Sequence, residues 1–189
     1  MAALQNVKFE DWLKIAPLLG TFVAFVAAVV QYMRSERWKR IEFVGESMRN
    51  MKSDAAVINV TTMLDWANRS VRLFPEREEE AKQWVMVTHA DVAKALRPAD
   101  EHGFTDVEAR IREQFDVYFD YLERFYQFVK GGLIPAKAFQ PLLQYWIDLI
   151  SQPREPLIVK GQSAIWTYLQ TYGFVDARAF LRKLGAPIP

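Results

Sequence analysis

Cysteine is absent from the 189-residue sequence, and histidine occurs only twice. The lack of cysteine excludes a disulfide framework, a thiolate metal site and a cysteine nucleophile. Lysine and arginine, 24 residues together, nearly balance 23 aspartates and glutamates, so the formal net charge is only +1. A dedicated nucleic-acid-binding protein usually carries a basic excess or a concentrated basic stripe. We therefore predict no nucleic-acid partner.

Charge is also missing from one long run, residues 15–33, IAPLLGTFVAFVAAVVQYM. As an α-helix this run would be roughly 28 Å long, close to the thickness of the hydrocarbon core of a bilayer. Its only polar side chains are Thr21 and Gln31, and its apolar residues surround the helix instead of forming one stripe. The run predicts a transmembrane helix in contact with membrane lipid. A buried helix of a soluble protein and a cleaved signal peptide are the alternatives, and the mixed charges before the run disfavour the signal peptide.

Aromatic and basic residues flank the apolar run. Lysine and arginine are concentrated after it, and the positive-inside tendency places that side in the cytoplasm. We therefore predict a single-pass protein of the bacterial inner membrane, with residues 1–14 outside and residues 34–189 in the cytoplasm. The sequons that begin at Asn59 and Asn68 would then stay unmodified. The predicted membrane-interface anchors are Trp12, Tyr32, Arg34, Arg37, Trp38, Lys39 and Arg40.

Three small residues, Gly20, Ala24 and Ala28, recur every four positions within the apolar run. Small residues at this spacing lie on one face of a helix and let a second transmembrane helix approach closely. We predict that they form a helix-packing interface. The alternative is that this face contacts lipid and the helix is a simple tether.

Helical periodicity dominates the remainder of the chain. A capping box, Thr105 to Glu108, marks the start of the clearest helix, and Gly131-Gly132 marks its end. Pro141 is expected to kink or split the helix that contains it. A short extended piece is expected at 157–159. The expected fold is all-α: the transmembrane helix and one domain of five to seven helices. The expected helices cover residues 35–51, 54–74, 76–96, 105–130, 135–150, 163–172 and 175–184.

Polar residues that could carry chemistry are few. Asp116, Asp120 and Glu123 share one helical face, but a carboxylate-bridged dimetal site would also require Glu-x-x-His motifs, which the sequence lacks. We interpret them as a solvated acidic face. His89, in WVMVTHADVA, has no nucleophile near it in sequence and is interpreted as structural. We predict no catalytic residue, no metal site and no cofactor.

Aromatic residues are dense in FDVYFDYLERFYQF, residues 115–128. Stacking platforms for single-stranded nucleic acid place basic residues beside the aromatics, whereas acidic residues stand here. Phe119, Tyr126 and Phe128 fall outside the main apolar stripe of this helix. We favour packing within the chain for these three over contact with a partner protein.

Three segments, MLDWANRSVRLF (63–74), YFDYLERFYQFVKGGLI (118–134) and LLQYWIDLI (142–150), carry a resemblance to known proteins. They resemble a set of uncharacterised bacterial proteins that have one N-terminal transmembrane helix and a cytoplasmic helical domain of unknown function. The resemblance covers about half of the chain, ends before Pro153 and implies the architecture alone, since no catalytic residues are assigned in that family.

These observations lead to one functional expectation and one alternative. The expectation is a membrane-tethered, non-enzymatic interaction module that serves as an accessory subunit of an inner-membrane protein complex. Its partners would be lipid and other membrane-protein subunits. The alternative is a membrane-bound enzyme or small-ligand sensor, with a pocket in the helical domain that includes His89 or Asp65.

Overall fold

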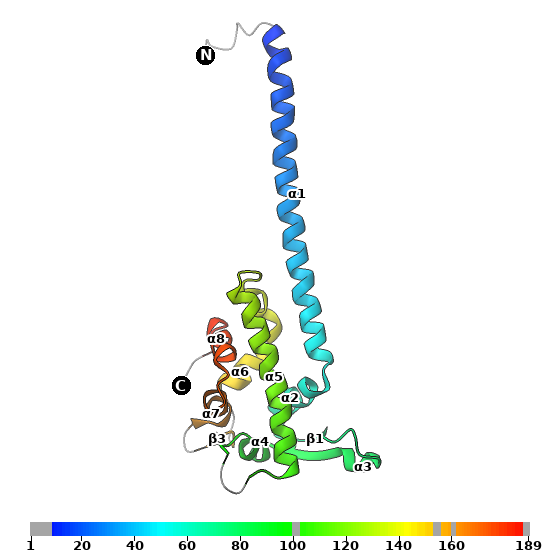
Figure 1. Cartoon of the computed structure of the whole chain (residues 1–189), viewed down its shortest axis with the longest axis vertical. Coiled ribbons are helices and arrows are strands. Elements are labelled where there is room, and N and C mark those ends of the chain that lie inside the picture. The colour runs from blue at the N-terminus through cyan, green and yellow to red at the C-terminus, as the bar shows by residue number, and fades with distance from the viewer. Residues whose placement is uncertain (1–8, 100–102, 153–155, 160–161, 187–189) are drawn as a thin grey trace. The chain divides into compact units, whose positions relative to one another are not determined.

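A computed structural model describes residues 9–99, 103–152, 156–159 and 162–186, with side chains from residue 17 onward. Over these residues the fold is all-α, with a long N-terminal helix, seven shorter α-helices and two small antiparallel sheets (Figure 1). This confirms the predicted fold class. The chain divides into two compact units, residues 1–43 and 44–189. The predicted boundary between residues 33 and 34 is a different one, since it marks where the helix leaves the lipid, and it stays a prediction.

Helix α1, Phe9–Ser53, contains the apolar run and continues through the expected 35–51 segment without interruption. The hydroxyl of Thr21 donates a hydrogen bond to the carbonyl oxygen of Pro17 (2.8 Å), which satisfies a polar group within the apolar surface. Every described residue from 17 to 35 is exposed within the first unit. An 18-residue window of this helix has a mean hydropathy of 1.5, and none of the window is buried. By length and composition, α1 is therefore able to cross a membrane.

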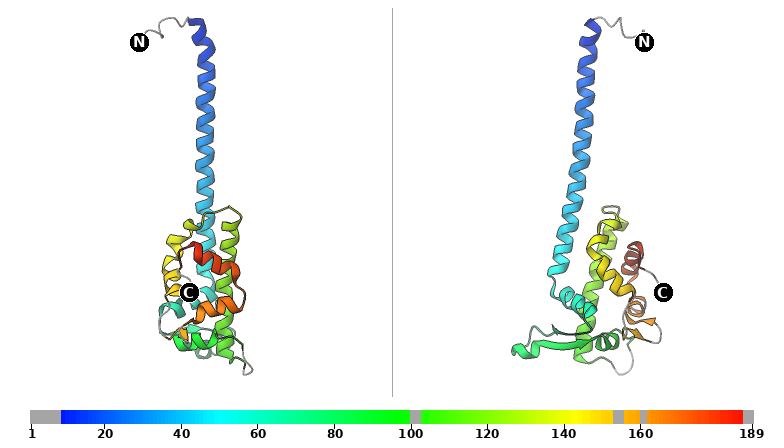
Figure 2. Two further views of the ribbon diagram at one scale, coloured as in Figure 1. Left: turned by 90° about the vertical axis from the view of Figure 1, so that its left-hand side faces the viewer. Right: turned by 180° about the vertical axis from the view of Figure 1, so that it is seen from behind.

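Helix α5, Asp106–Lys130, is the central element of the second unit and packs against α2 (Ala55–Asp65), α4 (His89–Ala95) and α8 (Val175–Lys183) (Figure 2). The predicted capping box is present: Thr105 accepts from the Glu108 N–H, and Glu108 accepts from the Thr105 N–H. After the helix, Gly132 has a φ of 70°, a conformation that favours glycine. Both predicted ends of this helix are confirmed.

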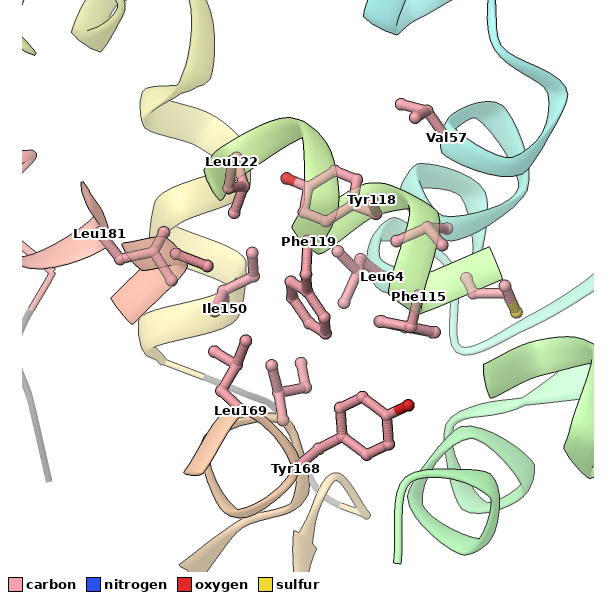
Figure 3. Close-up of a cluster of buried hydrophobic side chains, with 14 of the residues drawn as sticks. Val57, Leu64, Phe115, Tyr118, Phe119, Leu122, Ile150, Tyr168, Leu169 and Leu181 are labelled. Atoms are coloured by element: carbon pink, nitrogen blue, oxygen red, sulfur yellow. The ribbon is translucent and has the colours of Figure 1, made fainter. Parts of the chain in front are cut away.

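The core of the second unit lies between α5 and the helices around it. Phe119 is fully buried among side chains from α2, α5, α6, α7 and α8 (Figure 3). Tyr126 and Phe128 are partly buried and pack against the same core. The expectation that all three pack within the chain is therefore confirmed. The side chains labelled around Phe119 include Leu64, Phe115, Leu122, Ile150, Tyr168, Leu169 and Leu181.

Two expected helices, 54–74 and 76–96, are wrong in part. The first ends at Asp65 and is followed by strand β1, Asn68–Arg72; the second is divided into α3 (Glu80–Gln83), strand β2 (Trp84–Thr88) and α4. Strands β1 and β2 pair antiparallel, with Val71 opposite Val85. The sequence WVMVT is rich in residues that favour strands, and the residues it pairs with are 12 to 20 positions away, so helical periodicity alone missed the pairing.

The remaining elements follow the expected order. A 3₁₀ turn, η1 (Ala136–Ala138), precedes α6 (Gln140–Ser151), which places Pro141 in the first turn of α6, where its missing N–H costs little. The expected split near this proline is confirmed. Short strands β3 (Ile158–Val159) and β4 (Gln162–Ser163) pair, and α7 (Ala164–Thr171) and α8 follow.

Candidate interaction surfaces

The predicted helix-packing residues Gly20, Ala24 and Ala28 are all exposed on α1. A Cβ atom added at Gly20 would meet no other atom within 4 Å, so none of the residues that the structure describes covers that position. Large apolar side chains around the same helix are also exposed, including Phe22 (64%) and Val23 (65%). The first unit thus presents an apolar surface that contains the small-residue face.

Most of the predicted interface anchors are exposed. Tyr32 and Trp38 show 66% and 69% of their surface. Arg34, Arg37, Lys39 and Arg40 are exposed beside them, and Lys39 forms a 3.4 Å ion pair with Glu36. Trp12 belongs to α1, but its side chain lies outside the described residues, as do residues 1–8 and His102.

The acidic face of α5 is not simply solvated, and that expectation is wrong for two of its three members. Asp116 is partly buried and accepts a hydrogen bond from the hydroxyl of Tyr168 on α7. Burial raises the pKa of Asp116 above its ordinary value, and the Tyr168 hydrogen bond and the Arg112 charge oppose this rise only in part. Burial, together with the neighbouring carboxylate, also raises the pKa of Tyr168. Only Asp120 is exposed as predicted.

Glu123 has a structural role that its sequence position did not indicate. Its carboxylate accepts from the backbone N–H groups of Asp176 (3.3 Å) and Ala177 (3.5 Å), in the first turn of α8. The residue preceding α8, Phe174, provides no side-chain cap. Glu123 therefore substitutes for a local cap and places a negative charge at the positive end of the α8 dipole.

Arg112, also on α5, is a further residue that sequence reasoning missed. Its guanidinium donates to the carbonyl oxygens of Ala95 (2.9 Å), the last residue of α4, and of Arg97 (3.0 Å), which lies just beyond it. The guanidinium carbon lies 4.2 Å from the ring centre of Phe104 and 4.5 Å from that of Tyr172. These contacts hold α4, α5 and α7 together, so Arg112 is a structural cation.

His89 and Asp65, either of which was expected in the pocket of an enzyme or sensor, belong to different helices, α4 and α2. His89 lies at the start of α4 and is 2% exposed. Asp65 is the last residue of α2, and its carboxylate accepts a hydrogen bond from the hydroxyl of Tyr145 on α6. Neither residue lines the hollow beside α4 and α7 or the groove at the end of α1. Among the described residues, no group of three or more histidine, cysteine or acidic side chains could hold a metal ion.

No protein-family model, no curated protein and no solved structure matches this chain. The fold and its surfaces therefore define the class: an all-α protein with one N-terminal helix that is able to span a membrane.

Proposed function

We propose that the chain is a membrane-tethered, non-enzymatic interaction module and an accessory subunit of a protein complex in a bacterial inner membrane. The observation that carries the proposal is the full exposure of the apolar part of α1 in a chain whose second unit has an apolar core of its own. A soluble protein rarely exposes so large a contiguous apolar surface, because each buried Å² of apolar area is worth about 25 cal/mol. Lipid and another transmembrane helix would cover it.

The proposed topology places the N-terminus outside and the second unit in the cytoplasm. The basic residues after the apolar run support this orientation, since Lys and Arg are retained on the cytoplasmic side. The sequon at Asn59 does not oppose this orientation, because the Asn59 side chain is 8% exposed and donates to the Arg72 carbonyl oxygen and to Gln114, both at 3.0 Å. A glycan on Asn59 would break these bonds, so its sequon is not an argument for an external second unit.

The test is extraction of the full chain from native membranes in a mild detergent, followed by size analysis. We expect a complex larger than the 22.0 kDa chain that contains at least one other membrane subunit. Ala24→Leu should weaken this complex by filling the small-residue face, whereas Phe22→Leu, on the opposite side of the helix, should not. A stable 22.0 kDa monomer with no co-purifying subunit would refute the proposal.

A small-ligand sensor is the second candidate, and one observation favours it. A hollow of about 290 Å³ lies beside the end of α4 and the start of α7, with Leu96, Arg97, Gln162 and Thr167 in its lining. Its volume is near the lower limit for small-molecule sites. A saturable rise in the melting temperature of the full chain with a small apolar acid, abolished by Ala93→Trp in the lining, would establish this function.

A further inference from the structure

A groove lies along the C-terminal turns of α1, within the second unit. It has a volume of about 450 Å³, and we call it the basic groove. Met48 is buried and forms part of its apolar lining, whereas Leu142 of α6 is 38% exposed. The lining residues are Gly45, Met48, Arg49, Lys52, Ser53 and Leu142.

Helix α6 continues the apolar surface of the basic groove. Its inner face is buried through Leu143, Ile147 and Ile150. Its outer side carries two large exposed side chains, Leu142 (38%) and Tyr145 (52%), next to the exposed polar residues Gln140 and Asp148. Large exposed side chains beside a groove are typical of a surface that another molecule covers.

Gly45 gives an independent indication. Glycine in the interior of a helix is disfavoured relative to alanine. A Cβ at position 45 would meet no atom of the described residues within 4 Å, so packing among them does not require a glycine there. A small residue at this position leaves room for the backbone of a helix of another molecule to approach.

The positive charges of the basic groove indicate what kind of molecule occupies it. Arg49 and Lys52 are exposed, and within the part of the chain that the structure describes neither forms an ion pair. No acidic side chain is among the lining residues. An occupant with carboxylates beside its apolar side chains would therefore complement both the lining and the rim.

We propose that the basic groove is the docking site for an acidic amphipathic helix of a partner subunit. The apolar side chains of that helix lie over Gly45, Met48 and Leu142, and its carboxylates pair with Arg49 and Lys52. This inference rests on the proposed function, because it names the surface through which the tethered module holds its partner.

The test places a photoreactive benzoylphenylalanine at Leu142 of the full chain in native membranes. Irradiation should join this position to an acidic amphipathic segment of a membrane subunit, identified by peptide mass spectrometry. Gly45→Leu and the double variant Arg49→Glu/Lys52→Glu should each lower the crosslink yield by about tenfold or more, as loss of a close contact or charge pair does. Lys130→Glu, an exposed cation outside the groove, is the matched control and should leave the yield unchanged.

The outcomes separate the two proposals. If partner subunits co-purify but position 142 does not crosslink to them, the docking site is refuted while the tethered module stands. The same holds if Gly45→Leu leaves the crosslink yield unchanged. A crosslink to a second copy of this chain, or to lipid alone, also refutes the docking site. Absence of any co-purifying subunit refutes the proposed function itself. Gly45→Leu and the double variant should keep the helix content and melting temperature of the full chain, which shows that a loss of crosslinking is not a loss of fold.

Discussion

Truncation of Phe125 to alanine tests whether the second unit has a solid core or room for a ligand. Phe125 is 1% exposed on α5. Its ring centre lies 4.8 Å from that of Phe139, which precedes α6, and 6.2 Å from that of Phe180 on α8. One side chain thus connects three elements that are distant in sequence.

Phe125→Ala should lower the free energy of unfolding by about 3–5 kcal/mol, because it removes a large buried side chain and leaves a cavity. Aromatic pairing contributes about 0.5–1.5 kcal/mol of this loss. For a folded unit of this size the melting temperature should fall by about 6–20 °C. The assay is unfolding of the full chain by urea and by heat in mild detergent, with near-ultraviolet circular dichroism as the signal.

Leu133→Ala is the matched control, since Leu133 is 60% exposed and its truncation should change the free energy of unfolding by less than about 0.5 kcal/mol. A cycle with Phe139→Ala should return a coupling energy of about 0.5–1.5 kcal/mol for the stacked pair. A loss below about 1 kcal/mol for Phe125→Ala would contradict the close packing described above. Such a result would favour the small-ligand sensor, which needs a pocket among the helices, over the non-enzymatic interaction module.

Three further predictions concern the anchor and the acidic face of α5. Val26→Arg places a charge near the centre of the apolar run at a cost of about 2.5–3.5 kcal/mol, so the chain should leave the membrane fraction after an alkaline carbonate wash, unlike Val26→Leu. Glu123→Ala removes the cap of α8 and should lower the free energy of unfolding by about 1 kcal/mol, whereas Asp120→Ala, at an exposed position on the same face, should not. The pKa of Asp116 is raised by burial, so the folded state binds more protons and stability should fall as pH rises from the ordinary carboxyl range through the raised pKa. Asp116→Asn should abolish this fall in melting temperature, and an unchanged pH profile would contradict the assignment.

Local pattern was sufficient for the elements that depend on nearby residues. The capping box at Thr105, the end of α5 at Gly131-Gly132 and the break before α6 all arise from contacts within a few positions of the chain, which the sequence displays directly. Strands β1 and β2 were missed because a strand is stabilised by a partner distant in sequence, and helical spacing in 76–96 gave no sign of that partner. The role of Glu123 was missed for the same reason, since its partners lie 53 and 54 residues away.

The sequence by itself determined the long apolar helix, the balance of charge and the all-α class, because hydrophobic run length and periodicity are properties of consecutive residues. Only the tertiary structure decided which polar groups are buried. Asp116 contacts α7 and Glu123 contacts α8 because the C-terminal part of the chain folds back onto α5. Arg49, Lys52 and Leu142 line one groove because α6 packs near the last turns of α1. Burial and proximity across long sequence separations are created by packing, and no local pattern encodes them.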